Sequence, residues 1–307
     1  MHLVVPFASD DSEACRHVLR DLALPNLARL IARLEPEARD EGTAATFSPP
    51  HERALATARG WHGADGTLPF AAHAAAGDGL GAADVAWGLV TPAHWQLGRE
   101  HATMVDPAQL HLGEAESRAL FDTVRDLFES EGFVAAWGAA ERWYIGRAEL
   151  QGFATASLDR VIGRNVDGWL GETRSAMGRL VRRLQSEVQL VFHEHAVNES
   201  REARGEAVVN SFWLSGCGRA QASNAVHEAA VNDSLRTPLH AGDWAAWAEA
   251  WQAIDGGLLA REGEGIATLT LCGERSAERF ASAPTGLLHR LRKRWNAAEP
   301  HTVLEGL

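Results

Sequence analysis

Side chains suited to holding an anion are concentrated in residues 193–219, HEHAVNESREARGEAVVNSFWLSGCGR. Arginine makes bidentate contacts with phosphate or carboxylate, and asparagine orients such a group without adding charge. We therefore predict that His195, Asn198 and Arg201 line a cleft, and that Arg201 contacts a bound anion there. The alternative is a polar helix end, in which the same side chains satisfy backbone carbonyls and neighbouring glutamates.

A second cluster of the same residue types lies in SLDRVIGRNVDGWL, where Arg160, Arg164 and Asn165 surround a glycine. Two arginines four positions apart, with a glycine between them, predict a cradle for an anion. The competing interpretation is a loop crossed by Asp–Arg pairs, which contribute little at a protein surface. The sequence leaves both interpretations open.

Residues that would perform catalysis are fewer. Ser48, in FSPPHERA, is a weak candidate nucleophile because a serine needs a base or a metal to activate it. Its place before two prolines favours the N-cap of a helix. His193 and His195 form an H-x-H pair, which would share a metal in a strand but diverges at a helix end. Spacing supplies no third ligand, so we predict neither a metal nor a cofactor.

The three cysteines, Cys15, Cys217 and Cys272, are odd in number and widely spaced, which argues against a disulfide framework and a CxxC zinc site. Cys217 and Cys272 each follow a predicted strand and precede a glycine. They are therefore placed to share one sheet edge as a thiolate site. Buried, inert thiols are the alternative.

Composition restricts the partners. The chain of 307 residues carries a net charge of -12, and a negative field repels phosphate backbones. Its longest basic run, HRLRKRWN at 289–296, is interpreted as the last turn of a helix, so nucleic acid is not expected. No run approaches the ~18 apolar residues of a membrane helix, and the first residues do not form a signal peptide. We expect a cytoplasmic protein with a small phosphorylated or carboxylate ligand, or a protein partner.

The elements that position these residues alternate between strands and helices at both ends of the chain. Apolar residues predict strands at 2–8, 207–216 and 265–273. Helical spacing predicts a helical region at 9–34 broken by Pro25, and a helix that ends at Gly60. Further helices are predicted at 174–195 and at 243–261, where Trp244, Trp247 and Trp251 share one face. This alternation predicts an α/β fold with a mostly parallel sheet and flanking helices.

Between the two ends, from about residue 68, the sequence becomes rich in glycine and alanine. A strand pair is predicted at 84–98 and 100–106, then a helix at 113–132 and strands at 133–138 and 141–146. We therefore predict a core formed by residues 1–78 and 172–307, with a small α+β domain inserted at 79–171.

Three segments in this order resemble the archaeal-type, cofactor-independent phosphoglycerate mutases of the alkaline-phosphatase superfamily. More closely they resemble the bacterial RpfE-type proteins, which are phosphoglycerate-mutase-like regulatory proteins. Residues 195–219 are similar to a family run H-P-V-N-x-x-R-x-x-x-G-x-P-P-A-N followed by a strand. Residues 68–91 resemble the family's G-P-F-E-A-x-G-x-G segment, and residues 250–276 resemble its late helix and strand. The resemblance implies an alkaline-phosphatase-like core and places the equivalents of His195, Asn198 and Arg201 close to the substrate cleft.

The chain differs from this family at the positions of the metal ligands. Family enzymes hold two divalent metals with aspartate and histidine ligands at the end of the sheet. Here the first strand places Pro6 and Phe7 where an aspartate is expected, and the late strand offers CGER at 272–275 in place of Asp-His. A guanidinium is always cationic and cannot ligate a divalent ion, so Arg275 argues for a catalytically degenerate core.

The leading prediction is therefore a catalytically degenerate phosphoglycerate-mutase-like protein that recognises a small anion or a protein partner. One alternative is an active phosphoglycerate mutase or phosphatase whose metal ligands come from other positions. Another is an enzyme that uses a thiol or a histidine for a different reaction on the same phosphoglycerate-mutase-like fold. Fold analogy alone cannot choose among these functions.

Overall fold

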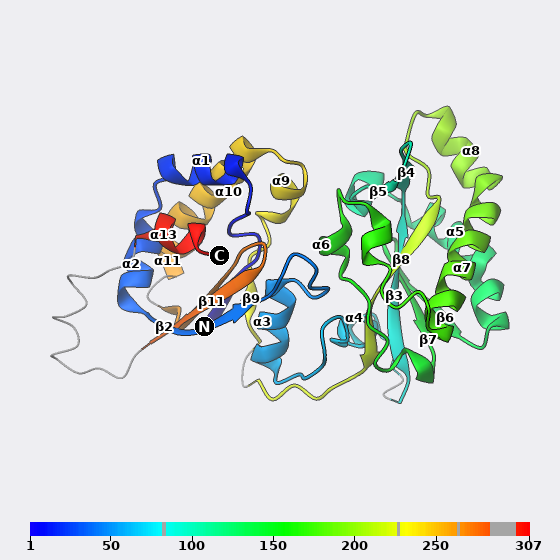
Figure 1. The fold of residues 1–307 in the computed structure, drawn as a ribbon, viewed down its shortest axis with the longest axis horizontal. Coiled ribbons are helices and arrows are strands. Elements are labelled where there is room, and N and C mark those ends of the chain that lie inside the picture. The colour runs from blue at the N-terminus through cyan, green and yellow to red at the C-terminus, as the bar shows by residue number, and fades with distance from the viewer. Residues whose placement is uncertain (82–83, 226–227, 263–264, 283–298) are drawn as a thin grey trace. The chain divides into compact units, whose positions relative to one another are not determined.

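The computed structural model describes residues 1–81, 84–225, 228–262, 265–282 and 299–307, which form two compact units (Figure 1). One unit combines Met1–Gly60 with Ser223–Leu307, and we call it the discontinuous unit. The other, Trp61–Ala222, is the inserted unit. The basic run at 289–296 lies outside the described residues.

The division between the units differs from the predicted boundaries at 78/79 and 171/172. Helices α4 (Phe70–Gly77) and α7 (Ala176–His193) pack against the sheet of the inserted unit. Strand β8 (Ser211–Arg219) is a member of that sheet. The prediction followed the change in composition. The observed boundary instead reflects burial, because the apolar face of each helix is buried against the sheet of the inserted unit.

The discontinuous unit contains a five-stranded mixed sheet. Its order is β2 (Glu35–Glu41), β11 (Ser276–Ala281), β10 (Thr268–Cys272), β1 (His2–Val5) and β9 (Ala230–Val231). Strand β1 runs parallel to both β10 and β9, whereas β11 runs antiparallel to β10 and to β2. The predicted α/β class, with a sheet and flanking helices, is confirmed.

Alternation along β1 assigns its residues to two sides of this sheet. Leu3 and Val5 enter the main core with helices α1 (Glu13–Asp21), α2 (Pro25–Arg33) and α10 (Trp244–Ala253). Val4 faces the other way, into a smaller cluster beneath helix α3 (Pro50–Arg59) (Figure 1). Period-two alternation requires this division.

Several local predictions are confirmed in this unit. The helical region breaks at Pro25, which becomes the first residue of α2, and α3 ends at Gly60 in the left-handed conformation that glycine favours (φ 74°). Trp247 and Trp251 are fully buried and Trp244 packs against the same core. The remaining elements are α9 (Arg236–His240), a π-helical turn η4 (Ile254–Leu259), α11 (Ala260–Glu262) and α13 (Pro300–Glu305).

The inserted unit is built on a four-stranded antiparallel sheet, in the order β6 (Val134–Ala139), β7 (Arg142–Gly146), β3 (Ala86–Ala93) and β8. Helix α5 (Glu114–Ser130) and α7 cover one face, and α4 packs against β3 and β8 (Figure 1). The smaller elements are β4 (Trp95–Leu97), β5 (Ala102–Met104), η1 (Pro107–Leu110), η2 (Ala148–Leu150), α6 (Leu158–Val161), η3 (Val166–Trp169) and α8 (Ala196–Ala203).

Three strand assignments differ from the sequence prediction. Strand β8 was predicted in the core sheet but pairs antiparallel with β3 in the inserted unit. No strand was predicted at 35–41 or at 276–281, yet these residues form edge strand β2 and strand β11, which pair with each other. Strand β2 is charged and exposed along most of its length, so no hydrophobic alternation marks it. Backbone pairing with β11 defines it instead.

Among the helices formed by the described residues, none is both long enough and apolar enough to cross a membrane.

Candidate functional site

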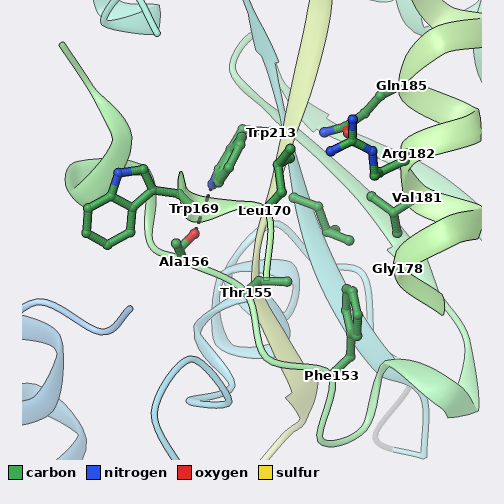
Figure 2. A pocket seen from close by; sticks show the side chains of 11 residues that line it. Phe153, Thr155, Ala156, Trp169, Leu170, Gly178, Val181, Arg182, Gln185 and Trp213 are labelled. Atoms are coloured by element: carbon green, nitrogen blue, oxygen red, sulfur yellow. Dashed lines mark hydrogen bonds between the residues drawn. The ribbon is translucent and has the colours of Figure 1, made fainter. Parts of the chain in front are cut away.

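A pocket in the inserted unit combines aromatic walls with polar side chains (Figure 2). Strand β8, helix α7 and the segment between η2 and α7 contribute its walls. The lining residues are Phe153, Thr155, Ala156, Trp169, Leu170, Gly178, Val181, Arg182, Gln185, Trp213 and Leu214.

The two indoles of the pocket are held by different contacts. The Nε1–H of Trp213 donates to the carbonyl of Ala156 at 2.9 Å, which fixes the ring against the wall. The guanidinium carbons of Arg160 and Arg164 lie 5.1 and 5.6 Å from the centre of the Trp169 ring. Cation–π attraction operates at these distances, so the two arginines orient Trp169.

The polar groups of the pocket come mainly from one helix face. Arg182 and Gln185 lie three positions apart on α7, a spacing that places both on the same side, and Figure 2 shows them reaching toward Trp213. Gln185 is buried, and its Nε2 donates to the carbonyl of Phe212 at 3.3 Å. The Arg182 guanidinium is at the exposed rim and has no hydrogen-bond or ion-pair partner within the described part of the chain.

The hydroxyl of Thr155 adds a further polar feature. Its residue is 9% exposed, and among the residues that the structure describes only the weakly polar thiol of Cys217 interacts with this hydroxyl. A buried hydroxyl without a strong partner is unfavourable and is normally satisfied by water or a ligand. The pocket therefore offers apolar walls, one rim cation and a hydroxyl around a cavity of about 20 Å³, so it has room for one small anionic group or a water molecule at its mouth.

The residues predicted to form the anion cleft have protein partners instead. Arg201 is 1% exposed: its Nε donates to Ala207 O at 2.8 Å, and its Nη2 donates to Leu110 O at 2.5 Å. Its Nη1 also donates to Glu116 at 2.6 Å. Asn198 is buried, donates to the carbonyls of Phe192 and Val209, and accepts from the Val209 amide. These contacts agree with the alternative interpretation, in which the side chains satisfy backbone groups and glutamates.

The H-x-H pair is divided between two helices. His193 is the exposed last residue of α7, whereas His195 is the N-cap of α8 and accepts from the Val197 amide at 3.2 Å. The Nε2 of His195 lies 3.0 Å from the Thr123 hydroxyl. The residues that follow His195 form helix α8. No group of three or more metal-ligating side chains occurs among the described residues.

The second predicted cluster supports the pocket rather than forming a cradle. Asn165 is the N-cap of η3, and its side-chain oxygen accepts from the Asp167 amide at 3.1 Å. Arg160 is 3% exposed, and both Arg160 and Arg164 stack over Trp169. Their link to the pocket is the indole that they orient.

At the ends of β1 and β10 in the discontinuous unit, other residues stand where the family resemblance implies metal ligands. Phe7 follows β1 with φ 58°, a conformation that is unusual for a bulky residue, and the amide of Ala8 donates to Cys272 O at 2.8 Å. Arg275, just beyond β10, forms an ion pair with Asp11. A phenyl group, a buried thiol and a guanidinium do not fit the aspartate–histidine set that the resemblance implies.

Ser48 occupies a buried position just before α3. The residue is 2% exposed, and its carbonyl accepts from Arg53 Nη1 at 2.5 Å. The N-cap of α3 is Pro49 rather than Ser48, and no side chain caps this helix end. The carbonyl of Ser48 therefore helps to hold Arg53, while the predicted capping role is wrong.

The cysteines do not share a sheet edge, because Cys217 belongs to β8 of the inserted unit and Cys272 to β10 of the discontinuous unit. All three thiols are buried. Burial raises the pKa of Cys15 to about 11 and that of Cys217 to about 12, and it raises the pKa of Cys272 as well. The structure thus fits the alternative of buried thiols that stay protonated at neutral pH.

The pocket residues Trp169, Arg182, Gln185 and Trp213 were not identified from the sequence. Arg182 lies in the run LVRRLQSE, where it is indistinguishable from its neighbour Arg183. In the structure Arg183 pairs with Glu131 at 2.6 Å, whereas Arg182 lines the pocket. The helical spacing of Arg182 and Gln185 indicates that both lie on one face of a helix. It does not indicate that Trp169 and Trp213 form the opposite wall of a pocket.

No family model and no curated protein sequence matches the chain. Solved structures with a similar chain trace include the following two. A cofactor-independent phosphoglycerate mutase from Thermoplasma acidophilum is 14% identical, with a TM-score of 0.38, over 93% of this chain and 90% of that one. The PH0037 protein from Pyrococcus horikoshii is 13% identical, with a TM-score of 0.44, over 92% of this chain and 87% of that one.

Proposed function

We propose that this chain is a phosphoglycerate-mutase-like protein of the RpfE type, which binds a small organic anion as a regulatory protein instead of catalysing the metal-dependent reaction. The pocket of the inserted unit is the anion site in this proposal. The observation that carries it is the Arg182 guanidinium, which has no protein partner in the described part of the chain and stands at the rim of an aromatic pocket.

The chemistry of the pocket indicates the kind of ligand. A carboxylate or phosphate group would pair with Arg182, since a guanidinium makes bidentate contacts with planar or tetrahedral oxyanions. The apolar part of the ligand would lie against Trp169 and Trp213. The Thr155 hydroxyl would donate to the ligand or to a water that accompanies it.

The loss of the metal-dependent reaction is supported by residue types at the ends of β1 and β10. The resemblance places a metal ligand near Arg275, and Arg275 instead pairs with Asp11. This pair neutralises the nearby carboxylate, which would otherwise be the natural metal ligand. A cation at this position opposes a divalent ion by charge as well as by ligand chemistry.

The anion site is tested by calorimetric titration of 3-phosphoglycerate and of benzoate into the wild type, Arg182→Gln and Arg183→Gln. Loss of a charge-assisted hydrogen bond costs roughly 1.5–3 kcal/mol, so we expect Arg182→Gln to weaken binding about 10- to 100-fold. Arg183→Gln is the matched control on the same helix and should bind like the wild type. Equal affinities for the three proteins, or no binding to the wild type, would reject the pocket.

The reaction is tested separately from the pocket. The purified protein is analysed for bound metals and assayed for phosphoglycerate isomerisation and phosphate-ester hydrolysis with manganese or zinc supplied. We expect no turnover. Stoichiometric metal with turnover that Ser48→Ala abolishes would replace this proposal by an active phosphoglycerate mutase or phosphatase with relocated ligands.

A further inference from the structure

A second cavity, of about 100 Å³, lies within the discontinuous unit on the face of the sheet that α3 covers. For comparison, a cavity of about 10–15 Å³ in this measure already holds one water molecule. Strands β1, β2, β10 and β11 supply one wall and α3 the other. The lining residues are His2, Ala38, Arg39, Asp40, Arg53, Ala54, Thr57, Thr270, Ala277 and Arg279.

The sequence explains why this space is open. On this face the strands carry small side chains, Ala38 on β2 and Ala277 on β11, opposite Ala54 of α3. Val4 and Cys272 pack with Ala54 and Ala277 in one small apolar cluster. Methyl groups cannot fill the distance between a helix and a sheet, so the polar residues around them border a cavity rather than a packed core.

The two arginines opposite each other in this cavity differ in how fully they are engaged. Arg53 uses every nitrogen: Nε lies 2.6 Å from Asp40, and its terminal nitrogens donate to Ser48 O and Arg275 O. Arg279 has an ion pair only at Nε, 2.7 Å from Glu37. Its two terminal nitrogens have no partner among the described residues. Arg279 therefore retains the donors that a bound oxyanion requires.

A neutral pair of side chains completes the polar wall. The Nε2 of His2 lies 2.9 Å from the hydroxyl of Thr270, which is 2% exposed. Burial, and then the charge of Arg279, lower the pKa of His2 to about 4, so the imidazole is neutral at pH 7. A neutral imidazole that donates through Nε2 leaves the Thr270 proton available to a ligand.

We propose that this cavity binds a small oxyanion of the sulfate or phosphate type, held by the terminal nitrogens of Arg279 and the hydroxyl of Thr270. The site is distinct from the aromatic pocket of the inserted unit and takes a compact, fully polar ligand. Asp40 and Glu37 do not exclude the anion, because each already neutralises the Nε end of an arginine.

Binding is linked to protonation of His2. The charged groups around this imidazole are Arg279 on β11, Arg53 on α3, Asp40 on β2 and the amino group of Met1. A bound anion offsets the charge of Arg279, which is one of the two main causes of the low pKa. Protonated His2 also adds a favourable charge. The anion therefore binds more tightly as the pH falls.

Sulfate is the probe for the test, because its charge stays constant between about pH 5.5 and 7.5, the interval in which the linkage is measured. Calorimetric titrations use the wild type, Arg279→Gln and Thr270→Val, with Arg20→Gln on the exposed face of α1 as the matched control. We expect saturable binding to the wild type and to Arg20→Gln. Arg279→Gln should lose at least about tenfold in affinity, and Thr270→Val several-fold.

Two further variants locate the bound sulfate and test its linkage to His2. Arg182→Gln should keep the binding step that Arg279→Gln loses, because Arg182 belongs to the pocket of the inserted unit. His2→Gln should still bind, but without the tightening at low pH and without proton uptake. Circular dichroism melts confirm that each variant is folded. The proposal is overturned if the wild type shows no saturable binding, or if Arg279→Gln binds as well as Arg20→Gln.

Discussion

The guanidinium of Arg201 lies 2.6 Å from the carboxylate of Glu116 and connects helix α8 to helix α5 within the inserted unit. Arg201 is 1% exposed, while Glu116 retains access to solvent on one side. Its remaining donors reach the carbonyls of Leu110 and Ala207. A residue that sequence analysis assigned to an anion is thus part of the fold.

Removing this arginine should destabilise the protein. Arg201→Ala leaves two carbonyls without their donor and removes the buried one of the two arginines that pair with Glu116, which costs about 3 kcal/mol. Urea unfolding measures the change. Arg204→Ala is the control, since Arg204 pairs with the same Glu116 but is exposed, so its loss of stability should be much smaller. Equal losses for the two variants would contradict the structural role of Arg201.

A second prediction concerns Asp255, which lies in the π-helical turn and is 3% exposed. Its carboxylate accepts from the amide of Leu27 at 2.7 Å and from the amide and side chain of Asn26. It thus caps the first turn of α2, whose own N-cap residue, Leu24, provides no side-chain acceptor. Asp255→Ala should cost about 2–3 kcal/mol, because buried amides lose their acceptor.

The comparison for Asp255 is an exposed cap in the same unit. Asp243 caps α10 by accepting from the Ala246 amide at 2.9 Å, and its replacement by alanine should cost only about 1 kcal/mol. Chemical denaturation of both variants gives the two values. A smaller effect for Asp255→Ala than for Asp243→Ala would show that burial adds nothing to this cap.

A third prediction follows from His2. Its pKa is lowered from 6.5 to about 4 in the folded chain, so between these values the unfolded state binds more protons than the folded state. Above about pH 6.5, His2 is neutral in both states and does not lower the free energy of unfolding. As the pH falls from 6.5 toward 4, protonation of His2 in the unfolded state lowers that free energy. Allowing for partial exposure, the loss is about 2 kcal/mol.

The experiment compares unfolding free energies between about pH 7.5 and 4.5 for the wild type, His2→Gln and His17→Gln. Carboxylates titrate in all three proteins, so the difference between curves isolates the imidazole. His2→Gln should lose less stability on acidification than the wild type, and His17→Gln, on the exposed side of α1, should follow the wild type. Parallel curves for all three would show that His2 is not desolvated.

Those features of the fold that depend on neighbouring residues are predictable from the sequence. Pro25 breaks a helix because it lacks an amide and restricts the residue before it, wherever the helix packs. Gly60 ends α3 because it adopts positive φ at no steric cost. The tryptophan spacing of α10 similarly defines one apolar face, which is buried in the main core.

The same reasoning did not recover strands β2 and β11. Strand β2 reads EPEARDE, without alternation and without β-branched residues, and it is a strand because β11 pairs with its backbone. Backbone hydrogen bonds do not depend on side-chain type, so an edge strand of this kind leaves little trace in composition. The unit boundaries were missed for a related reason, since the partners of α7 and β8 lie far away in the chain.

The role of each charged residue was also beyond the sequence. Arg182 and Arg183 are adjacent and chemically identical, yet one lines a pocket and the other pairs with Glu131. The α/β class, the helix limits and the apolar faces can be predicted from the sequence, because they arise from local sterics and periodicity. Which arginines are buried in the fold and which can meet a ligand depends on partners distant in the sequence, so it is visible only in the folded chain.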